Sequence, residues 1–417
     1  MKIVLHKGTK EIGGNCIELN TGNTSILLDY GLPLKPDSDM VDLSKNRFDA
    51  VIISHSHQDH YGLIDKISHE VPIYTSKLNH ELIQGLRLFL KKEPLENRFK
   101  FFKAWKTFTI GEFKITPYLV DHSASDSYGF LVKAGKKSIF YSGDFRSHGR
   151  KGKLFDKFVQ NPPKGIDALF MEGTMLNRSN DDFKDEYSVE EKIYTSIKDT
   201  KGLSFFIGSS QNIDRIVSAY RACKKSNKIF VIDIYTAWIL EKFKLVSKSI
   251  PNISWENIKV ISRGKYASYY YSILKENRDI FGEFTNEIYR KENNIDIDEI
   301  IKNPSSYFLK ISHKYIAEII QAVSPKKSTV IYSQWAGYLE KEHNESGYSS
   351  FLELKDNPNI NFIYAHTSGH AVLEDLIDFA RALNPKQLVP IHTDYPMEYK
   401  NHFNNVHEVA DGQEFSI

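Results

Sequence analysis

The stretch SHSHQDHYG at residues 54–62 places three imidazoles and one carboxylate within six consecutive positions, at His55, His57, Asp59 and His60. It directly follows a short apolar run of the length expected of a buried strand. Side chains two positions apart on an extended strand point the same way, and the following turn would bring Asp59 and His60 in from another side. Imidazole nitrogen and carboxylate oxygen are ligands that zinc accepts, so the stretch predicts one metal site or two adjacent ones. The alternative is a polar surface turn that happens to be rich in histidine.

The composition limits the class of protein. The 417 residues exceed one ordinary core, so we expect two domains or one domain with a large insertion. Lys plus Arg (55) nearly balances Asp plus Glu (53), a formal net charge of +2, which neither requires nor excludes a nucleic-acid partner. Cys16 and Cys223 are the only cysteines, which excludes a disulfide framework and a cysteine-rich metal site. With no apolar run of membrane-span length and no signal-peptide pattern, we expect a soluble, cytoplasmic, mixed α/β protein with no membrane association.

Other candidate ligands directly follow short apolar runs elsewhere in the chain. Each run has the length of a buried strand, and open sheets present groups at strand ends along one rim. The runs lie at 24–29, 113–119, 138–142, 168–171 and 387–391, and the polar residues at or just past their ends are Asp29, His122, Asp144, Glu172 and His392. The pattern predicts that distant parts of the chain converge on the histidine-rich stretch.

The residue types suffice for two zinc ions, with manganese as a working substitute. Two ions about 4 Å apart need a bridging carboxylate and roughly three further protein ligands each. The candidate ligands are His55, His57 and His122 for one ion, Asp59, His60 and His392 for the other, and Asp144 between them. Asp29 is a candidate to orient the imidazoles by hydrogen bonding.

The middle of the chain is less informative. Residues 177–190 are polar, acidic and without apolar periodicity, and we interpret them as the boundary of a second unit. There, an apolar strand at 203–207 leads into a turn with Ser209 and Ser210 that opens a helix, a common arrangement for binding an anion and an equally common helix cap. Residues 91–106 mix basic and aromatic side chains; a solvated edge with partly buried rings is the favoured interpretation, and contact with nucleic acid is the alternative.

The order of these motifs resembles the metallo-β-lactamase fold: His-x-His-x-Asp-His, a lone histidine, an aspartate in Ser-Gly-Asp, and a final histidine. The long interval between Asp144 and His392 is similar to that of the β-CASP nucleases, the group containing ribonuclease J and the pre-mRNA 3′-end cleavage endonuclease. Glu172 matches the first β-CASP motif, His366 in His-Thr-Ser-Gly-His the second, and His392 the third. The sequence after His392 is Thr393-Asp394, where the family usually has Gly-Glu.

The resemblance implies the fold and the domain bounds. It predicts an α/β protein with an αβ/βα metallo-β-lactamase sandwich built from residues 1–175 and 375–417. A β-CASP domain, residues 176–374, would be inserted between them.

The resemblance also implies a zinc-dependent nuclease that hydrolyses phosphodiester bonds of RNA or single-stranded DNA. Asp59 and Asp144 would serve catalysis through the metals, and His366 would be the general acid, with Glu172 hydrogen-bonding its other nitrogen. The residues expected to hold a neighbouring phosphate, which would favour 5′-end-directed exonuclease action, are Ser368, His370, Ser209 and Ser210.

Two alternatives stay open at this stage. One is a metallo-hydrolase of a small ester, lactone or cyclic nucleotide on the same site. The other is a non-catalytic nucleic-acid-binding subunit, which should have lost ligands, whereas all seven are present. The sequence leaves the oligomeric state undecided.

Overall fold

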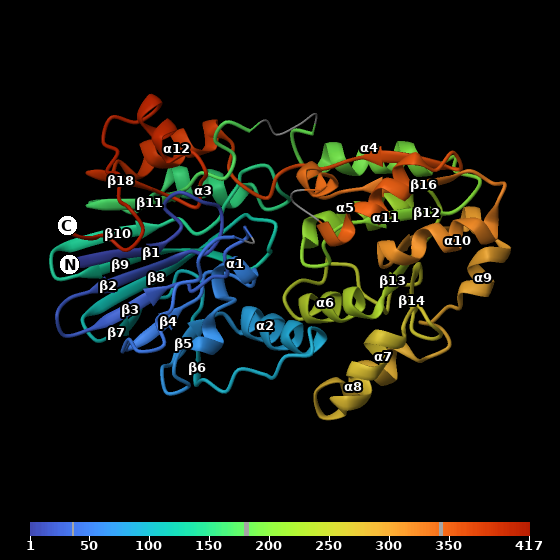
Figure 1. Ribbon diagram of the computed structural model, residues 1–417, viewed down its shortest axis with the longest axis horizontal. Helices are drawn as coiled ribbons and strands as arrows, with labels where there is room; N and C mark the ends of the chain where they lie inside the picture. The colour runs from blue at the N-terminus through green and yellow to red at the C-terminus, as the bar shows by residue number, and fades with distance from the viewer. Residues whose placement is uncertain (36, 179–182, 342–344) are drawn as a thin grey trace. The chain divides into compact units, whose positions relative to one another are not determined.

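The structure, a computed structural model, describes residues 1–35, 37–178, 183–341 and 345–417 (Figure 1). The chain forms two compact units. The first comprises Met1–Leu86, Glu93–Asn180 and Ser368–Ile417, and the second comprises Arg87–Lys92 and Asp181–Thr367. Residues 368–374, which we had assigned to the inserted domain, therefore pack in the first unit, because their side chains and backbone bond to residues that follow its strands.

The first sheet of the first unit is mixed. Its strands, in spatial order, are β19 (Glu414–Ser416), β1 (Lys2–Lys7), β2 (Cys16–Asn20), β3 (Ser25–Leu28), β4 (Ala50–Ile52), β5 (Ile73–Thr75) and β6 (Phe99–Phe101). The pairs from β19 to β3 are antiparallel and those from β3 to β6 are parallel. Parallel pairing aligns the carboxyl ends of β3, β4 and β5 at one edge, which is where the candidate ligands begin.

The second sheet of the first unit is also mixed. Its strands, in spatial order, are β18 (Gln387–Ile391), β11 (Ala168–Glu172), β10 (Lys137–Tyr141), β9 (Ser127–Ala134), β8 (Phe113–Val120) and β7 (Phe108–Ile110). The strands β10, β11 and β18 run parallel, so Asp144, Glu172 and His392 leave the same edge. This arrangement explains why three polar residues far apart in the sequence converge.

Apolar side chains fill the space between the two sheets, including Ile26 of β3, Val132 of β9 and Phe170 of β11. Figure 1 shows helices α3 (Lys153–Gln160) and α12 (Leu373–Leu383) over the outer face of one sheet and α2 (Lys77–Phe89) over that of the other. Among the described residues of this unit, the remaining α-helix is the short α1 (Gln58–Tyr61). The expected sandwich of two mixed sheets covered by helices is confirmed.

The second unit is built on a six-stranded parallel sheet. Its strands, in spatial order, are β14 (Ile258–Ile261), β13 (Ile229–Asp233), β15 (Tyr307–Lys310), β12 (Ser204–Ile207), β16 (Ser328–Tyr332) and β17 (Ile360–Tyr364). Its helices are α4 (Glu186–Ile197), α5 (Ile213–Lys225), α6 (Ile234–Lys244), α7 (Ser268–Glu276), α8 (Arg278–Ile288), α9 (Ile297–Lys302), α10 (Ile316–Val323) and α11 (Glu345–Asp356). Phe205 of β12 packs with Ile319 of α10 and Leu354 of α11 in the core of this unit.

The polar segment at 177–190 contains the boundary between the two units, as expected. Residues 179–182 lie outside the described residues, but α4 begins within the segment at Glu186. Asp185 caps it, since its carboxylate accepts from the backbone N–H of Ser188 while the Ser188 side chain bonds back. Among the described residues, each helix is too short or too polar to cross a membrane.

Candidate metal centre

The histidine-rich stretch leaves β4 and turns sharply at α1. The turn is held against the end of β3: the backbone N–H of Tyr30 donates to the carbonyl of His60 at 2.8 Å. The contact requires glycine at position 31, because a Cβ there would lie 1.6 Å from the Asp59 carbonyl oxygen. The turn therefore fixes Asp59 and His60 beside the strand ends.

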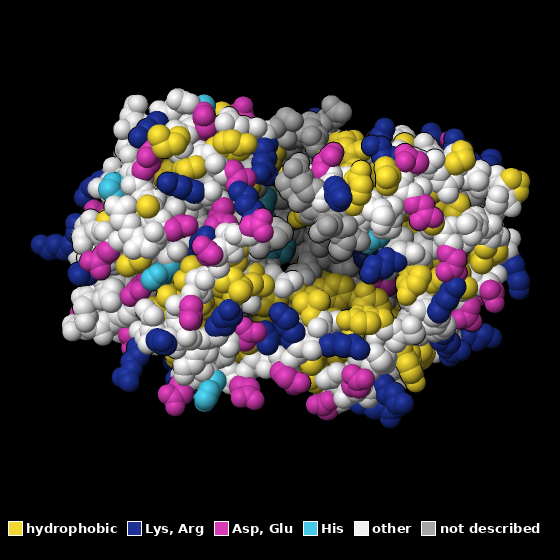
Figure 2. Space-filling view, in the orientation of Figure 1, with side chains coloured by type: hydrophobic (Ala, Val, Ile, Leu, Met, Phe, Trp, Pro, Cys, Tyr) yellow, Lys and Arg dark blue, Asp and Glu magenta, His cyan; other side chains and the backbone are white. Residues whose placement is uncertain are grey.

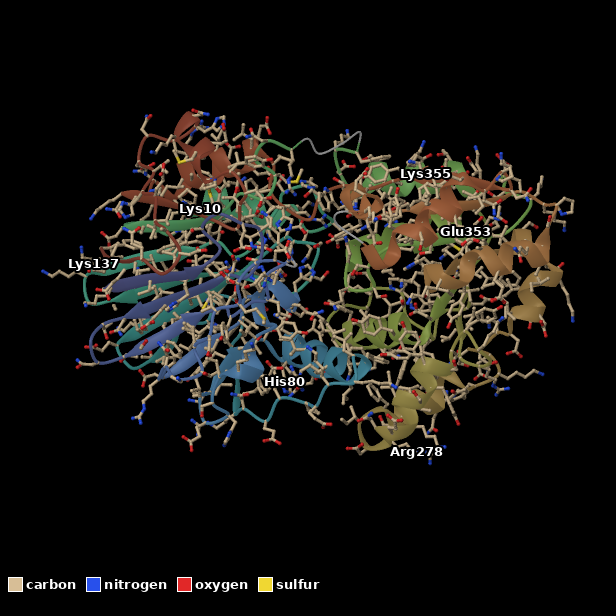
Figure 3. The ribbon with its side chains drawn as sticks, viewed as in Figure 1. Lys10, His80, Lys137, Arg278, Glu353 and Lys355 are labelled. Carbon is tan, nitrogen blue, oxygen red and sulfur yellow. The ribbon has the colours of Figure 1, made fainter. Side chains whose placement is uncertain are left out.

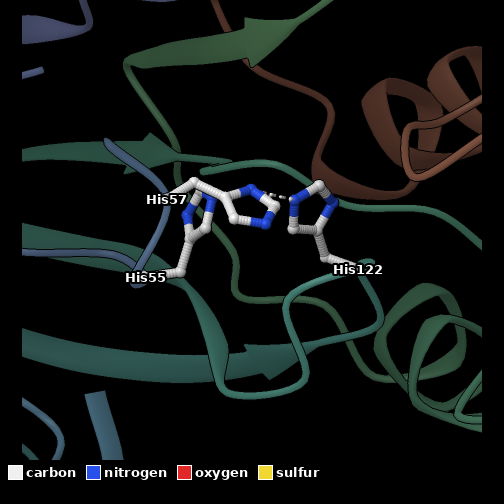
Figure 4. A group of neighbouring side chains, drawn as sticks. All are labelled: His55, His57 and His122. Atoms are coloured by element: carbon white, nitrogen blue, oxygen red, sulfur yellow. Dashed lines mark hydrogen bonds between the residues drawn. The ribbon is translucent and has the colours of Figure 1, made fainter. Parts of the chain in front are cut away.

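Three imidazoles form the first ligand group: His55, His57 and His122 (Figure 4). Their offered nitrogen atoms lie within 4.8 Å of one another. The Nδ1 of His57 and the Nε2 of His122 face each other at 3.3 Å. His122 Nδ1 lies 2.6 Å from the carbonyl oxygen of Gly369, to which it donates, so Nε2 carries the lone pair in the neutral ring.

The second ligand group mixes carboxylates and imidazoles: Asp59, His60, Asp144 and His392. Asp144 belongs to the second group and also approaches histidines of the first. Its Oδ2 is 3.0 Å from His60 Nε2, 3.6 Å from His392 Nε2 and 3.8 Å from His55 Nε2. The carboxylate expected to bridge two ions is thus the one that reaches imidazoles of both groups.

Several buried polar atoms at this centre have no hydrogen-bond partner among the described residues: His55 Nε2, His392 Nε2 and Asp144 Oδ1. Leaving such atoms unsatisfied costs about 1–3 kcal/mol each. A bound cation would satisfy all of these atoms at once, so the residues present fit the predicted metals.

Asp29 orients the imidazoles, as expected. Its Oδ2 accepts from His60 Nδ1 at 2.7 Å and from the Tyr141 hydroxyl at 2.5 Å, and Oδ1 accepts from the backbone N–H of Ser54. Asp29 and His392 both have a left-handed backbone conformation, with φ of 58° and 51°. Non-glycine residues rarely adopt this conformation, and such strain concentrates at functional sites.

The two groups differ in their electrostatics. Burial lowers the pKa of His57 to about 4 and holds the pKa values of His55 and His122 well below that of an ordinary imidazole. For His60, burial opposes the charged form, but the carboxylates of Asp144, Asp59 and Asp29 raise its pKa well above the usual value. The three-histidine group is therefore neutral near pH 7, whereas His60 in the other group is protonated when no cation is bound.

Glu172 contacts a different histidine from the one we expected. Its Oε1 lies 3.2 Å from His370 Nδ1, and its two oxygens also accept backbone N–H bonds from Phe145 and Thr174. The expected partner, His366, lies in the second unit, so the bond between Glu172 and His366 stays a prediction. Although burial opposes the charged form, Glu172 raises the pKa of His370. His370 also forms a third potential ligand group with His122 and Asp144.

Two residues that the sequence analysis missed fix the loop that carries His370. Arg146 Nη1 donates to the carbonyl of Ser368 at 2.8 Å, and His148 Nε2 lies 2.9 Å from the same oxygen. The Ser368 hydroxyl accepts from the backbone N–H of His370. The position of Arg146, two residues after Asp144 at a strand end, was the only sequence signal of this role.

The remaining predicted residues, His366, Ser209 and Ser210, lie in the second unit. The Ser210 hydroxyl bonds the Thr236 hydroxyl, and the Ser209 hydroxyl accepts from the backbone N–H of Gln211. His366 Nδ1 accepts from Arg215 Nη1 at 3.1 Å, which places the ring proton of the neutral form on Nε2.

Arg215 is fully buried and was not predicted. Its guanidinium donates twice to Glu186, to the carbonyl and hydroxyl of Ser333, and to the carbonyl of Thr367. The loops that follow β16 and β17 are thus both held by one side chain from α5. Sequence periodicity does not distinguish a buried arginine from an exposed one, so nothing in the sequence pattern marked it.

Comparisons with known proteins agree with this geometry. Residues 27–191 match the family described as "Beta-lactamase superfamily domain", and residues 361–405 match the "Zn-dependent metallo-hydrolase RNA specificity domain". The second match contains His366, Ser368, His370 and His392. Together with the ligand groups, these matches support metal use by the chain.

Similar proteins cover nearly the whole chain. "Ribonuclease J" of Helicobacter pylori is 24% identical, covering 95% of this chain and 56% of that protein, so the chain spans just over half of this relative. "Probable RNase MJ4" of Methanocaldococcus jannaschii is 24% identical, covering 94% of this chain and 93% of that protein. A crystal structure of a protein of unknown function from Enterococcus faecalis V583 covers 99% of both chains with a TM-score of 0.76 and 20% identity, which shows a shared fold.

Proposed function

Because the chain belongs to the metallo-β-lactamase superfamily, in its ribonuclease J-like β-CASP branch, we propose that it is a zinc-dependent nuclease that hydrolyses phosphodiester bonds of RNA. The observation that carries the proposal is the pair of ligand groups whose histidines are both approached by Asp144, in a chain that also matches an RNA specificity domain. A binding subunit without catalysis would not need to keep seven candidate ligands, six of them buried, gathered in this way.

Two zinc ions per chain are part of the proposal. His55, His57 and His122 would hold one, Asp59, His60 and His392 the other, with Asp144 between them. Zinc at such a site supplies Lewis-acid stabilisation of charge on the phosphoryl oxygens and makes water a stronger nucleophile at neutral pH.

We assign the proton donor to His370 in place of His366. A phosphodiester with a poor alkoxide leaving group needs a proton on the departing oxygen, and general acid catalysis contributes about 10²–10⁴ in rate. Glu172 accepts from His370 Nδ1 and favours the imidazolium, so the transferable proton is the one on Nε2. Arg146 holds the loop in place through the Ser368 carbonyl.

His366 takes a different role in this proposal. The Arg215 donor at Nδ1 disfavours the imidazolium, because a protonated Nδ1 would face another N–H. His366 is then a neutral Nε2–H donor suited to bind a phosphate oxygen. With the Ser209–Ser210 turn of the same unit, it would favour substrates with a 5′-phosphate and 5′-end-directed action.

The experiment compares two substrate types. Metal-loaded protein is incubated with end-labelled RNA and, in parallel, with an activated p-nitrophenyl phosphodiester. His370→Ala should retain both metals, slow RNA cleavage by about 10²–10⁴ and slow the activated ester much less. Absence of RNA cleavage by the parent protein at full zinc content would overturn the function.

The roles of the two histidines are separated by matched variants. His366→Gln keeps a donor near the position of Nε2, whereas His366→Asn keeps only a group near Nδ1. We expect His366→Gln to preserve discrimination between 5′-monophosphate and 5′-hydroxyl RNA better than His366→Asn. If His366→Ala reproduces the leaving-group dependence predicted for His370→Ala, the original assignment of the acid is restored.

A further inference from the structure

A basic and aromatic surface segment lies at the edge of the first sheet, away from the ligand groups in sequence. Residues 98–106, RFKFFKAWK, contain four basic side chains and no acidic one. We call them the β6 edge segment. The segment includes β6, the last strand in the order of its sheet, and continues toward β7 in the second sheet. The metal centre gives no reason for this cluster of basic and aromatic side chains.

The rings of the β6 edge segment divide between the core and the surface. Phe102 is buried among the side chains between the sheets, whereas Phe101 is 50% exposed and Trp105 is 55% exposed. On the outer face, the His80 ring of α2 lies 4.3 Å from the Phe99 ring and 5.3 Å from the Phe101 ring. Figure 3 labels His80 on this part of the unit. The segment thus presents aromatic faces to solvent beside a strand edge.

Trp105 has a backbone conformation that does not favour tryptophan. Its φ is 58°, in the left-handed region that glycine adopts at no cost. The turn is held by backbone bonds alone, from Trp105 N–H to the Pro117 carbonyl at 2.7 Å and from Lys106 N–H to the Lys103 carbonyl at 3.1 Å. Neither packing nor backbone geometry therefore requires this exposed ring, and backbone strain of this kind points to a functional reason.

The basic side chains of the segment are available to a ligand. In the part of the chain that the structure describes, no carboxylate forms an ion pair with Arg98, Lys103 or Lys106, all three of which are exposed. Lys100 donates to the Tyr74 hydroxyl at 2.8 Å. Figure 2 shows hydrophobic and basic side chains side by side over the region where Figure 1 labels α2 and β5.

We propose that the β6 edge segment binds single-stranded RNA outside the metal centre, with bases stacked on Phe101 and Trp105 and phosphates against Lys103 and Lys106. Exposed rings interleaved with unpaired cations are the combination that single-stranded nucleic-acid sites use. A protein partner added to the strand edge would need backbone groups more than cations, so charge favours the polyanion. The proposal goes beyond the nuclease function by adding a second contact along the strand.

The test measures RNA affinity in full-length, zinc-loaded protein carrying His370→Ala, which slows cleavage. The probe is a fluorescein-labelled single-stranded RNA of about 20 nucleotides, read by anisotropy at several salt concentrations. Trp105→Gly should weaken binding about 5- to 100-fold, the range for loss of one stacked base. The double variant Lys103→Glu with Lys106→Glu should also weaken binding and reduce the slope of log K against log salt by about 1.4.

Two controls keep the proposal falsifiable. Trp105→Gly should unfold no more easily than the parent, because glycine suits a φ of 58°. Lys137→Glu reverses an exposed charge at the β9–β10 turn, which Figure 3 shows at the far end of the same unit, and should leave RNA affinity unchanged. Unchanged affinity in both Trp105→Gly and the double lysine variant, or tighter binding of duplex than of single-stranded RNA, would overturn the proposal.

The outcome is independent of the nuclease function. Hydrolysis of the p-nitrophenyl ester by protein without His370→Ala should be unaffected by all of these changes, because none of the residues touches a ligand group. Affinity lost in the variants of a protein that cleaves no RNA would support the binding segment and refute the nuclease. RNA cleavage by the parent protein, together with unchanged RNA affinity in the variants, would support the nuclease and refute the binding segment.

Discussion

The metal centre and the Arg215 network both place charged groups in the interior, but they differ in whether their polar atoms have hydrogen-bond partners. Every nitrogen of the Arg215 guanidinium donates to an acceptor of the same unit, with Glu186 taking two of the bonds. At the metal centre, His55 Nε2, His392 Nε2 and Asp144 Oδ1 find no such partner among the described residues. Since an unsatisfied buried polar atom is costly, the first cluster is built to hold loops and the second to be completed by a cation.

The largest expected effect comes from removing Asp144, the carboxylate that approaches histidines of both ligand groups. Asp144→Ala should lose zinc from both positions and reduce RNA hydrolysis by more than about 10³-fold, because several kcal/mol of charge stabilisation disappear with the metals. Metal analysis and RNA cleavage measure the two losses. Asp167→Asn is the matched control. This buried carboxylate accepts from the backbone N–H of Ser138 in β10 and from Lys386, just before β18, and its loss should leave zinc content unchanged.

If Asp144→Ala keeps nearly parental zinc content and activity, the proposed difference between the metal centre and the Arg215 network is wrong. The buried carboxylate would then be a structural acceptor for His60, like Glu186 for Arg215.

The next largest expected effect is a loss of unfolding free energy in the second unit. Arg215→Met leaves Glu186 buried without its cation, which typically costs about 3–5 kcal/mol of unfolding free energy. Urea denaturation followed by tryptophan fluorescence reports mainly on this unit, because three of the four tryptophans, Trp238, Trp255 and Trp335, belong to it. Zinc content should be unchanged, since all described contacts of Arg215 lie within the second unit.

A double variant sharpens this result. Arg215→Met combined with Glu186→Leu removes both charges and should recover part of the lost stability, because an apolar pair can replace a buried ion pair. A cost below about 1 kcal/mol for Arg215→Met alone would show that the network does not hold the loops.

The two clusters were unequally visible in the sequence. Four ligands of the metal centre lie within residues 55–60, so local spacing after an apolar run sufficed to predict them, and strand ends supplied the others. Glu186 lies in a polar segment that showed no apolar periodicity, yet its side chain is fully buried. Periodicity reports burial of apolar side chains only, so a buried ion pair is invisible to it.

The choice between His366 and His370 could not be made from spacing. The two residues are four positions apart in one loop, and either could have matched the second motif. What separates them is a contact between residues 198 positions apart, Glu172 and His370, together with a donor from α5 at His366. Such contacts depend on the path of the loop between β17 and α12.

A smaller effect is expected from the residue that orients a ligand without being one. Asp29→Asn removes the charge that holds His60 Nδ1–H, and loss of such a partner typically weakens metal affinity 10- to 100-fold. Zinc competition against a chromophoric chelator measures it. Tyr141→Phe is the graded control, because it removes only one of the hydrogen bonds to Asp29 and should cost less. Equal affinity in Asp29→Asn and the parent would mean that His60 is oriented by Ser54 alone.

The smallest expected effect is a difference between the two ligand groups in how their zinc affinity depends on pH. Metal binding requires unprotonated imidazoles, so a site whose histidines carry protons releases them on binding and weakens as pH falls. Burial holds the pKa of His57 at about 4, and those of His55 and His122 are also lowered, so these ligands are already neutral at pH 6. The pKa of His60 is raised, because the carboxylates of Asp144, Asp59 and Asp29 outweigh the effect of burial. His60 must therefore give up one proton when a metal binds.

Zinc affinity of the three-histidine group should therefore be almost constant between pH 7 and pH 6, while that of the group containing His60 should fall by about tenfold. Calorimetric titration in buffers of different ionisation enthalpy counts the protons directly: about none for the first group and about one for the second. Asp29→Asn removes one of the carboxylates that raise the pKa of His60, so it should reduce the pH dependence of the second group while lowering its affinity. If both groups released a proton at pH 6.5, burial would not be keeping His57 neutral, and the electrostatic distinction between the two groups would be lost.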